Sequence, residues 1–162
     1  PPSPLKTGWY LSAADVLYTV LDVVLLTLFG VALSSCINYP LNTNGQGSAV
    51  GTVVSAGYGF ICGAYMPISS FGTGLQKVLS FLPGTYGTSL LRNHMLRGAY
   101  DEMSASGFPD EVIELIRDSV DCNMYFFDTK VTIPAMYAVL CGATAALVGL
   151  YVLLNVLGKA KK

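Results

Sequence analysis

Two long runs without a charged residue constrain this chain more than any other feature of its sequence. The first covers Val23 to Gln76, which is 54 residues, and the second covers Val131 to Gly158, which is 28 residues. A helix that crosses the hydrocarbon core of a bilayer needs about 20 mainly apolar residues. Charged residues make up only 12% of the chain, whereas a typical soluble domain has about 25%. The sequence therefore predicts an all-α membrane protein.

The first run is too long for one membrane-spanning helix, and a polar turn at 38–48 divides it. Residues 13–68 are therefore predicted to hold two spans, at Ala13–Ile37 and Gly47–Ile68, joined by that turn. The second run predicts a last span over 131–157.

The lysines set the expected orientation. The tail at 158–162 carries three lysines, whereas the segment 1–12 carries one. The positive-inside rule then places the C-terminus in the cytoplasm, the turn inside and segment 1–12 outside or at the outer interface. Because the chain opens with PPSP and has no initiator Met, we expect it to start partway through a longer protein. The expected location is the cell (plasma) membrane, crossed several times.

Residues 69–98 stay apolar although prolines and glycines interrupt the helical pattern. Pro67 is expected to end the second span, and Pro83 with Gly84 divides the segment that follows. A backbone that leaves helical geometry inside a bilayer must hide its polar groups in protein or in a watery cavity. We therefore predict a re-entrant or interfacial helical hairpin that dips in from the outer face.

Residues 99–130 are predicted to form an acidic extracellular loop that contains one short helix. The stretch FPDEVIELIRDSV is typical of an amphipathic helix. Pro109 suits its first turn, and Asp110 and Glu111 favour the positive end of the helix dipole. Its apolar side should pack on another part of the protein.

Small residues recur every four positions in two of the predicted spans and indicate close helix packing. In lipid, helices associate where small side chains let their backbones approach. The predicted packing residues are Gly51, Ser55, Gly59 and Gly63 in the second span, and Ala138, Gly142 and Ala146 in the last.

Asp22 lies deep inside the first predicted span, whereas Asp15, the other charged residue of that span, lies near its start. A carboxylate in hydrocarbon costs several kcal/mol unless it is paired or hydrated, so such a residue is a functional candidate. If the first span starts later than Ala13, however, Asp22 lies near the outer headgroups and needs no role. Both interpretations stay open on the sequence alone.

The sequence holds no motif for enzymatic chemistry, a metal site or nucleic-acid binding. The single histidine, His94, follows Arg92 and Asn93 and is expected at the outer interface rather than in catalysis. Hydrolase, metalloprotease and phosphate-loop motifs are absent, and the four cysteines include no CxxC pair. A net charge of −1 gives no reason to expect a nucleic acid as partner. We expect no catalytic residue and no cofactor bound by this chain.

The stretches GFICGAYMPIS and GLQKVLSFLPGTYGTSLLR, followed by a last span with a basic tail, resemble the C-terminal half of ABC-2-type transporter permeases. The resemblance runs from Leu11 to Lys162 and implies transmembrane helices four to six. The positions that match the family's motifs are Gly63, Pro67, Leu82, Pro83, Tyr86 and Arg92, and Gly84 lies in the same hairpin.

The resemblance implies a permease subunit that pairs with an identical or different permease and works with a separate cytoplasmic ATPase, which binds ATP and Mg. The hairpin would be the outer gate, and Asp22, Ser34, Ser35 and Asn38 would be polar candidates along the transport route. The exported solute stays open among drugs, peptides, lipids and glycans. Because the family's first three helices are missing, this chain alone is not expected to transport anything.

Two other function classes remain open. An ion-coupled secondary transporter would use Asp22 as its proton site, since such transporters also contain broken helices. A membrane assembly or sensory subunit would use the acidic outer loop to bind a partner.

Overall fold

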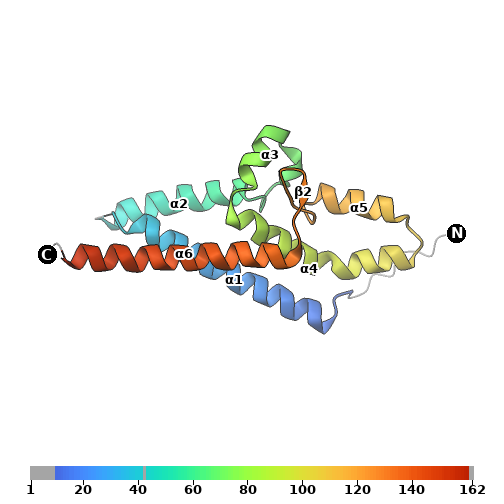
Figure 1. Cartoon of the computed structure of the whole chain (residues 1–162), viewed down its shortest axis with the longest axis horizontal. Helices are drawn as coiled ribbons and strands as arrows, with labels where there is room; N and C mark the ends of the chain where they lie inside the picture. The colour runs from blue at the N-terminus through green and yellow to red at the C-terminus, as the bar shows by residue number, and fades with distance from the viewer. Residues whose placement is uncertain (1–9, 42, 161–162) are drawn as a thin grey trace.

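The computed structural model describes residues 10–41 and 43–160, with side chains as far as residue 158. Lys6 and the three tail lysines, on which the predicted orientation depends, lie outside the described side chains. The described chain is helical, with one small β-hairpin (Figure 1). Its elements are α1 (Ala13–Asn38), α2 (Asn44–Ile61), η1 (Ile68–Ser70), α3 (Thr73–Leu79), α4 (Pro83–Ala105), α5 (Asp110–Ser119), β1 (Tyr125–Phe126), β2 (Thr129–Lys130) and α6 (Ile133–Ala160). The predicted helical class is confirmed.

Helices α1, α4 and α6 pack on one another and hold the main core. α1 and α6 run along the long axis of the molecule, whereas α4 starts beside them and continues past the start of α6 (Figure 1). The buried core residues that these three helices contribute are Phe29 from α1, Tyr86 and Leu90 from α4, and Met136 and Leu140 from α6. The core therefore joins α4, which belongs to the predicted helical hairpin, to both long helices.

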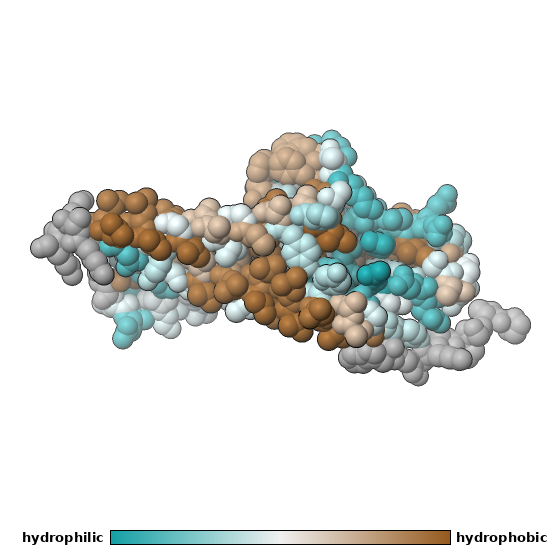
Figure 2. Space-filling view, turned by 60° about the horizontal axis from the view of Figure 1, so that its bottom comes forward, coloured by the Kyte–Doolittle hydropathy of each residue, from teal (hydrophilic) through white to brown (hydrophobic). Residues whose placement is uncertain are grey.

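Two of the described helices, α1 and α6, are long and apolar enough to cross a membrane. The two segments, Ala13–Asn38 and Ile133–Gly158, have 26 residues each and mean hydropathies of 2.3 and 2.1. At about 1.5 Å per residue they exceed the roughly 30 Å of a hydrocarbon core. Only 17% and 6% of their most apolar windows are buried, and the resulting apolar surface occupies a broad area of the molecule (Figure 2). An exposed apolar surface of this extent fits a membrane protein.

Helix α2 differs from the predicted second span. It runs from Asn44 to Ile61 rather than from 47 to 68, and it is not among the two helices above. Thr43 starts it by accepting a hydrogen bond from the backbone of Gln46. The helix ends because Gly63 adopts a left-handed conformation, with φ of 80°. The prediction that Pro67 ends this helix is therefore wrong.

The hairpin region holds the short helix α3 and the longer helix α4. Pro83 occupies the first turn of α4, where its missing N–H costs no hydrogen bond. α4 continues to Ala105, beyond the end at residue 98 that the sequence predicts and into the predicted loop. Helix α5 confirms the predicted short amphipathic helix. The strands β1 and β2 are joined by Phe127 and Asp128, both with positive φ, as a two-residue hairpin turn requires.

Candidate functional site

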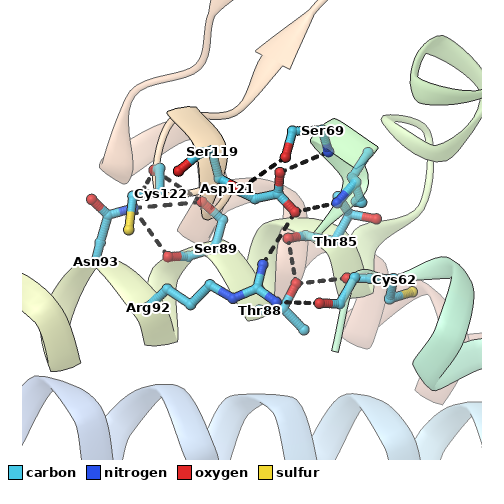
Figure 3. A network of polar contacts seen from close by, with 12 residues as sticks. Cys62, Ser69, Thr85, Thr88, Ser89, Arg92, Asn93, Ser119, Asp121 and Cys122 are labelled. Carbon is cyan, nitrogen blue, oxygen red and sulfur yellow. Dashed lines mark hydrogen bonds and ion pairs between the residues drawn. The ribbon is translucent and has the colours of Figure 1, made fainter. Parts of the chain in front are cut away.

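The first candidate site is a set of polar contacts around the break after α2, which we call the helix-break clamp (Figure 3). Its three central side chains are Thr88 and Arg92 of α4 and Asp121, which follows α5. The Asp121 carboxylate accepts hydrogen bonds from the backbone N–H groups of Ile68 and Ser69. It also forms an ion pair with Arg92 at 3.2 Å, and its side chain is 6% exposed.

The same clamp satisfies carbonyl groups that α2 leaves unpaired where it ends. The Arg92 guanidinium donates to the carbonyl oxygen of Gly63, and the Thr88 hydroxyl donates to that of Cys62 at 2.7 Å. A backbone that leaves a helix away from water needs such partners. Side chains of α4 and Asp121 therefore allow the chain to stay irregular beside an apolar core.

The backbone around α3 is satisfied in the same way. The Gln76 amide donates to the carbonyl oxygen of Phe71 at 2.7 Å. From the first turn of α4, the hydroxyls of Thr85 and Tyr86 donate to the carbonyl oxygens of Leu79 and Ser80. Side-chain hydrogen bonds thus reach the irregular stretches on both sides of η1 and α3 within the segment 62–82.

Gly84 lets the first turn of α4 approach the end of α2 closely. A Cβ atom at this position would lie 2.7 Å from the Tyr58 ring and 2.9 Å from the Cys62 sulfur. The Gly84 N–H donates to the Tyr58 hydroxyl at 3.3 Å. Of the residues that carry the sequence resemblance, the structure joins Gly63 to Arg92, places Pro83 and Gly84 in the first turn of α4 beside the end of α2, and bonds Tyr86 to the carbonyl of Ser80. Pro67 directly precedes η1, and Leu82 directly precedes α4.

A second polar cluster surrounds Asp22, which is completely buried. His94 places its Nδ1 atom 2.6 Å from one carboxylate oxygen, and the Tyr137 hydroxyl donates to the other at 2.5 Å. The Tyr18 ring stacks on His94 with centroids 5.1 Å apart. Asp22 thus joins α1, α4 and α6 at the level of the second turn of α6.

The structure buries His94 inside the protein, whereas its expected level at the outer interface stays a prediction. The side chain is 7% exposed and lies between the two long helices rather than at the surface. The partners of Asp22 are a histidine and a tyrosine rather than a lysine or arginine. The sequence did hold a signal for this placement, since Leu90, His94 and Gly98 are spaced four residues apart and all are buried.

The other predicted pathway residues lie far from Asp22. Ser34, Ser35 and Asn38 follow it by 12 to 16 residues on α1, which corresponds to about 18–24 Å along a helix. Ser34 and Asn38 line a groove of about 380 Å³ between α1 and α2, together with Gly51, Ser55 and Gly59. Three of the predicted packing residues therefore line this groove, although a Cβ at Gly59 would also lie 2.9 Å from the Tyr65 ring, and Gly63 lies beyond the helix.

The small residues of α6 face away from the rest of the chain. Ala138, Gly142 and Ala146 are exposed, and a Cβ added at Gly142 would meet no atom within 4 Å. α6 instead packs through its opposite side, on which Met136 and Leu140 are buried. Packing of the small residues against another chain stays a prediction.

Within residues 10–41 and 43–160, no group of three histidine, cysteine or acidic residues could hold a metal ion. Cys122 directly follows Asp121 of the clamp and is 1% exposed. Burial raises the pKa of this thiol, which keeps it protonated and slow to react as a nucleophile.

We expect Cys122 to resist thiol reagents as long as the chain is folded. A maleimide at pH 7 should leave it unmodified in detergent solution and modify it after unfolding, as peptide mass spectrometry would show. The exposed Ser106, changed to cysteine, provides the control thiol that should react in both states. Equal labelling of Cys122 and Ser106→Cys in the folded protein would contradict the buried position.

Comparison of the chain with protein-family models, curated proteins and solved structures found no match in any of the three.

Proposed function

We propose that this chain is part of the membrane permease of an ATP-driven ABC-2-type exporter. In this proposal it spans the cell membrane with its C-terminus in the cytoplasm, and it lines part of the transport route and the outer gate. A separate cytoplasmic ATPase supplies ATP hydrolysis, and a second permease completes the route. The observation that carries the proposal is the helix-break clamp, because it joins Gly63 and Arg92, two residues of the sequence resemblance, through a direct hydrogen bond.

The clamp suits a gate because side chains, rather than a continuous backbone ladder, connect the short helices η1 and α3 of the segment 62–82 to α4 and Asp121. Such a segment can shift as a unit when a few hydrogen bonds exchange, which is a common way for proteins to open and close. Its outer side is apolar, since Leu75, Val78 and Phe81 are exposed on α3 and the following turn. These side chains would lie in the outer leaflet, as the interfacial hairpin requires.

Gly84→Leu is expected to reduce the rate of export at least about tenfold in the complete transporter, which corresponds to an increase of about 1.4 kcal/mol in activation free energy. The added side chain would overlap Tyr58 and Cys62 and push the first turn of α4 away from α2. Pro83→Leu should act in the same direction, since it removes the fixed start of α4. Efflux from cells or vesicles, normalised to the amount of transporter in the membrane, measures the effect.

Gly74→Leu is the matched control, because a Cβ there meets no atom within 4 Å. It should leave export unchanged. Undiminished efflux with Gly84→Leu, at a normal level of inserted protein, would remove the gate from the proposal.

The Asp22 cluster favours a second candidate, an ion-coupled secondary transporter. A buried carboxylate that contacts a histidine can serve as a proton carrier in a membrane. The two candidates differ in their energy source. Co-purification with an ATPase and ATP-dependent efflux would support the exporter, whereas transport driven by a proton gradient without an ATPase would support the alternative.

A further inference from the structure

Arg117 on α5 is a half-buried arginine without an acidic partner. Arg92 and Arg97 each form an ion pair with an aspartate. Within the described part of the chain, no carboxylate oxygen lies within 4 Å of Arg117. Its Nη2 atom donates to the side-chain oxygen of Asn93 at 3.2 Å, and its guanidinium lies 5.4 Å from the Tyr100 ring centroid. Its Nε atom is buried and has no hydrogen-bond partner among the described residues.

A pocket of about 200 Å³ lies beside this guanidinium and is rich in hydrogen-bond donors. Its polar lining comes from Asn93, His94, Arg97, Tyr100, Asp101 and Arg117. Asn93 and His94 are more than nine-tenths buried. The Nδ1 atom of His94 faces Asp22, and its Nε2 atom has no hydrogen-bond partner in the described residues. Two arginines and a histidine thus border one small pocket.

The acidic groups near the pocket form no ion pair with Arg117, although the Glu114 carboxylate, one turn earlier on α5, interacts with it electrostatically. Asp22 contacts His94, and Asp15 lies 3.6 Å from Arg97. Asp101 is the one carboxylate among the described lining residues, and it is exposed at the rim. A half-buried guanidinium without an ion-pair partner is favourably placed to bind an anion, and its planar fork of donors matches a phosphate or a similar oxyanion.

We propose that this pocket binds a phosphate-type oxyanion through Arg117, with Arg97 as the second cation. Ile133, the first residue of the apolar helix α6, also lines the pocket. The pocket therefore lies at the end of that helix, where lipid headgroups meet a membrane-spanning segment. The phosphate can come from a lipid headgroup or from solution, and this inference holds whether or not the chain belongs to an exporter.

Binding to the full chain, purified in maltoside detergent without phosphate buffer, tests the proposal. Dioleoyl phosphatidylglycerol should raise the unfolding temperature and stay bound in native mass spectrometry, whereas dioleoylglycerol, which lacks the phosphate, should do neither. Stabilisation by inorganic phosphate alone, with no added effect of the lipid, would identify dissolved phosphate as the source. Equal effects of the two lipids without an effect of inorganic phosphate would overturn the proposal.

Arg117→Gln should weaken phosphate or lipid binding about tenfold, because a hydrogen bond to a charged group is lost. Lys130→Gln is the matched control: Lys130 is paired with Glu114 and lies outside the pocket lining, so its loss should leave binding unchanged. Asp101→Asn removes the rim carboxylate on an exposed position and should tighten binding several-fold. If Arg117→Gln does not fold, the Asp101→Asn variant is the deciding test. An unchanged affinity for phosphate or lipid in every pocket variant that folds would overturn the proposal.

Discussion

Asp121→Ala is expected to destabilise the folded chain by about 3 kcal/mol, the lower end of the range for breaking a buried ion pair. The change leaves the Arg92 guanidinium and the N–H groups of Ile68 and Ser69 without their acceptor. We use the lower end of the free-energy range because the Arg92 side chain is 22% exposed, so water can partly replace the lost carboxylate. Unfolding in detergent, followed by the loss of helical circular dichroism, measures the free energy difference.

Asp128→Ala is the control for backbone strain. Asp121 and Asp128 both adopt a positive φ, of 54° and 69°, which alanine tolerates poorly. Asp128, however, is exposed and holds no clamp contact. Its substitution should cost only about 1 kcal/mol. Equal losses in the two variants would show that the hydrogen bonds of Asp121 contribute nothing.

Asp22→Ala is the second change with a large expected effect, also about 3 kcal/mol. It leaves the Tyr137 hydroxyl and His94 without an acceptor, and each unsatisfied buried polar group costs about 1–3 kcal/mol. Combining Asp22→Asn with Tyr137→Phe in a double-mutant cycle should give a coupling energy of about 0.5–3 kcal/mol. Guanidinium-induced or thermal unfolding in detergent provides the four free energies.

Thr27→Val is the matched control for Asp22 on the same helix. The Thr27 hydroxyl donates only to a carbonyl of its own helix and is exposed, so its loss should change stability by less than about 0.5 kcal/mol. A coupling energy near zero between Asp22 and Tyr137 would show that their contact does not stabilise the protein.

The long helices could be predicted because their signals are local. Charge-free runs identify α1 and α6, and the acidic first turn identifies α5. The end of α2 is harder to predict, because the apolar pattern continues past Ile61 and proline is the more obvious helix breaker. The φ of 80° at Gly63, which ends the helix, leaves no mark in the sequence beyond the glycine itself. The full length of α4 could not be predicted because its last turns carry acidic residues, and hydropathy alone does not distinguish such a polar helix end from a loop.

The clamp could be predicted only in part, since its contacts are not local. The resemblance supplied Arg92 and Gly63, but nothing in the sequence marks Asp121 as their partner. Asp121 is 53 residues from Ile68, and no short spacing pattern connects such positions. For Asp22, the sequence left an interfacial position and a functional role open. The structure adds full burial and two partners, while a role in transport stays a prediction.

The order in which the Asp22 cluster is synthesised has a consequence for insertion into a membrane. Asp22 precedes His94 by 72 residues and Tyr137 by 115. At about 5–20 residues per second, α1 leaves the ribosome roughly 4–14 s before His94 is available. During that interval the carboxylate has neither partner, so α1 should stay displaced towards water or hold a protonated Asp22 until α4 arrives. We therefore expect the final packing of α1 to be a late step of biogenesis, completed only when α4 and α6 have been made.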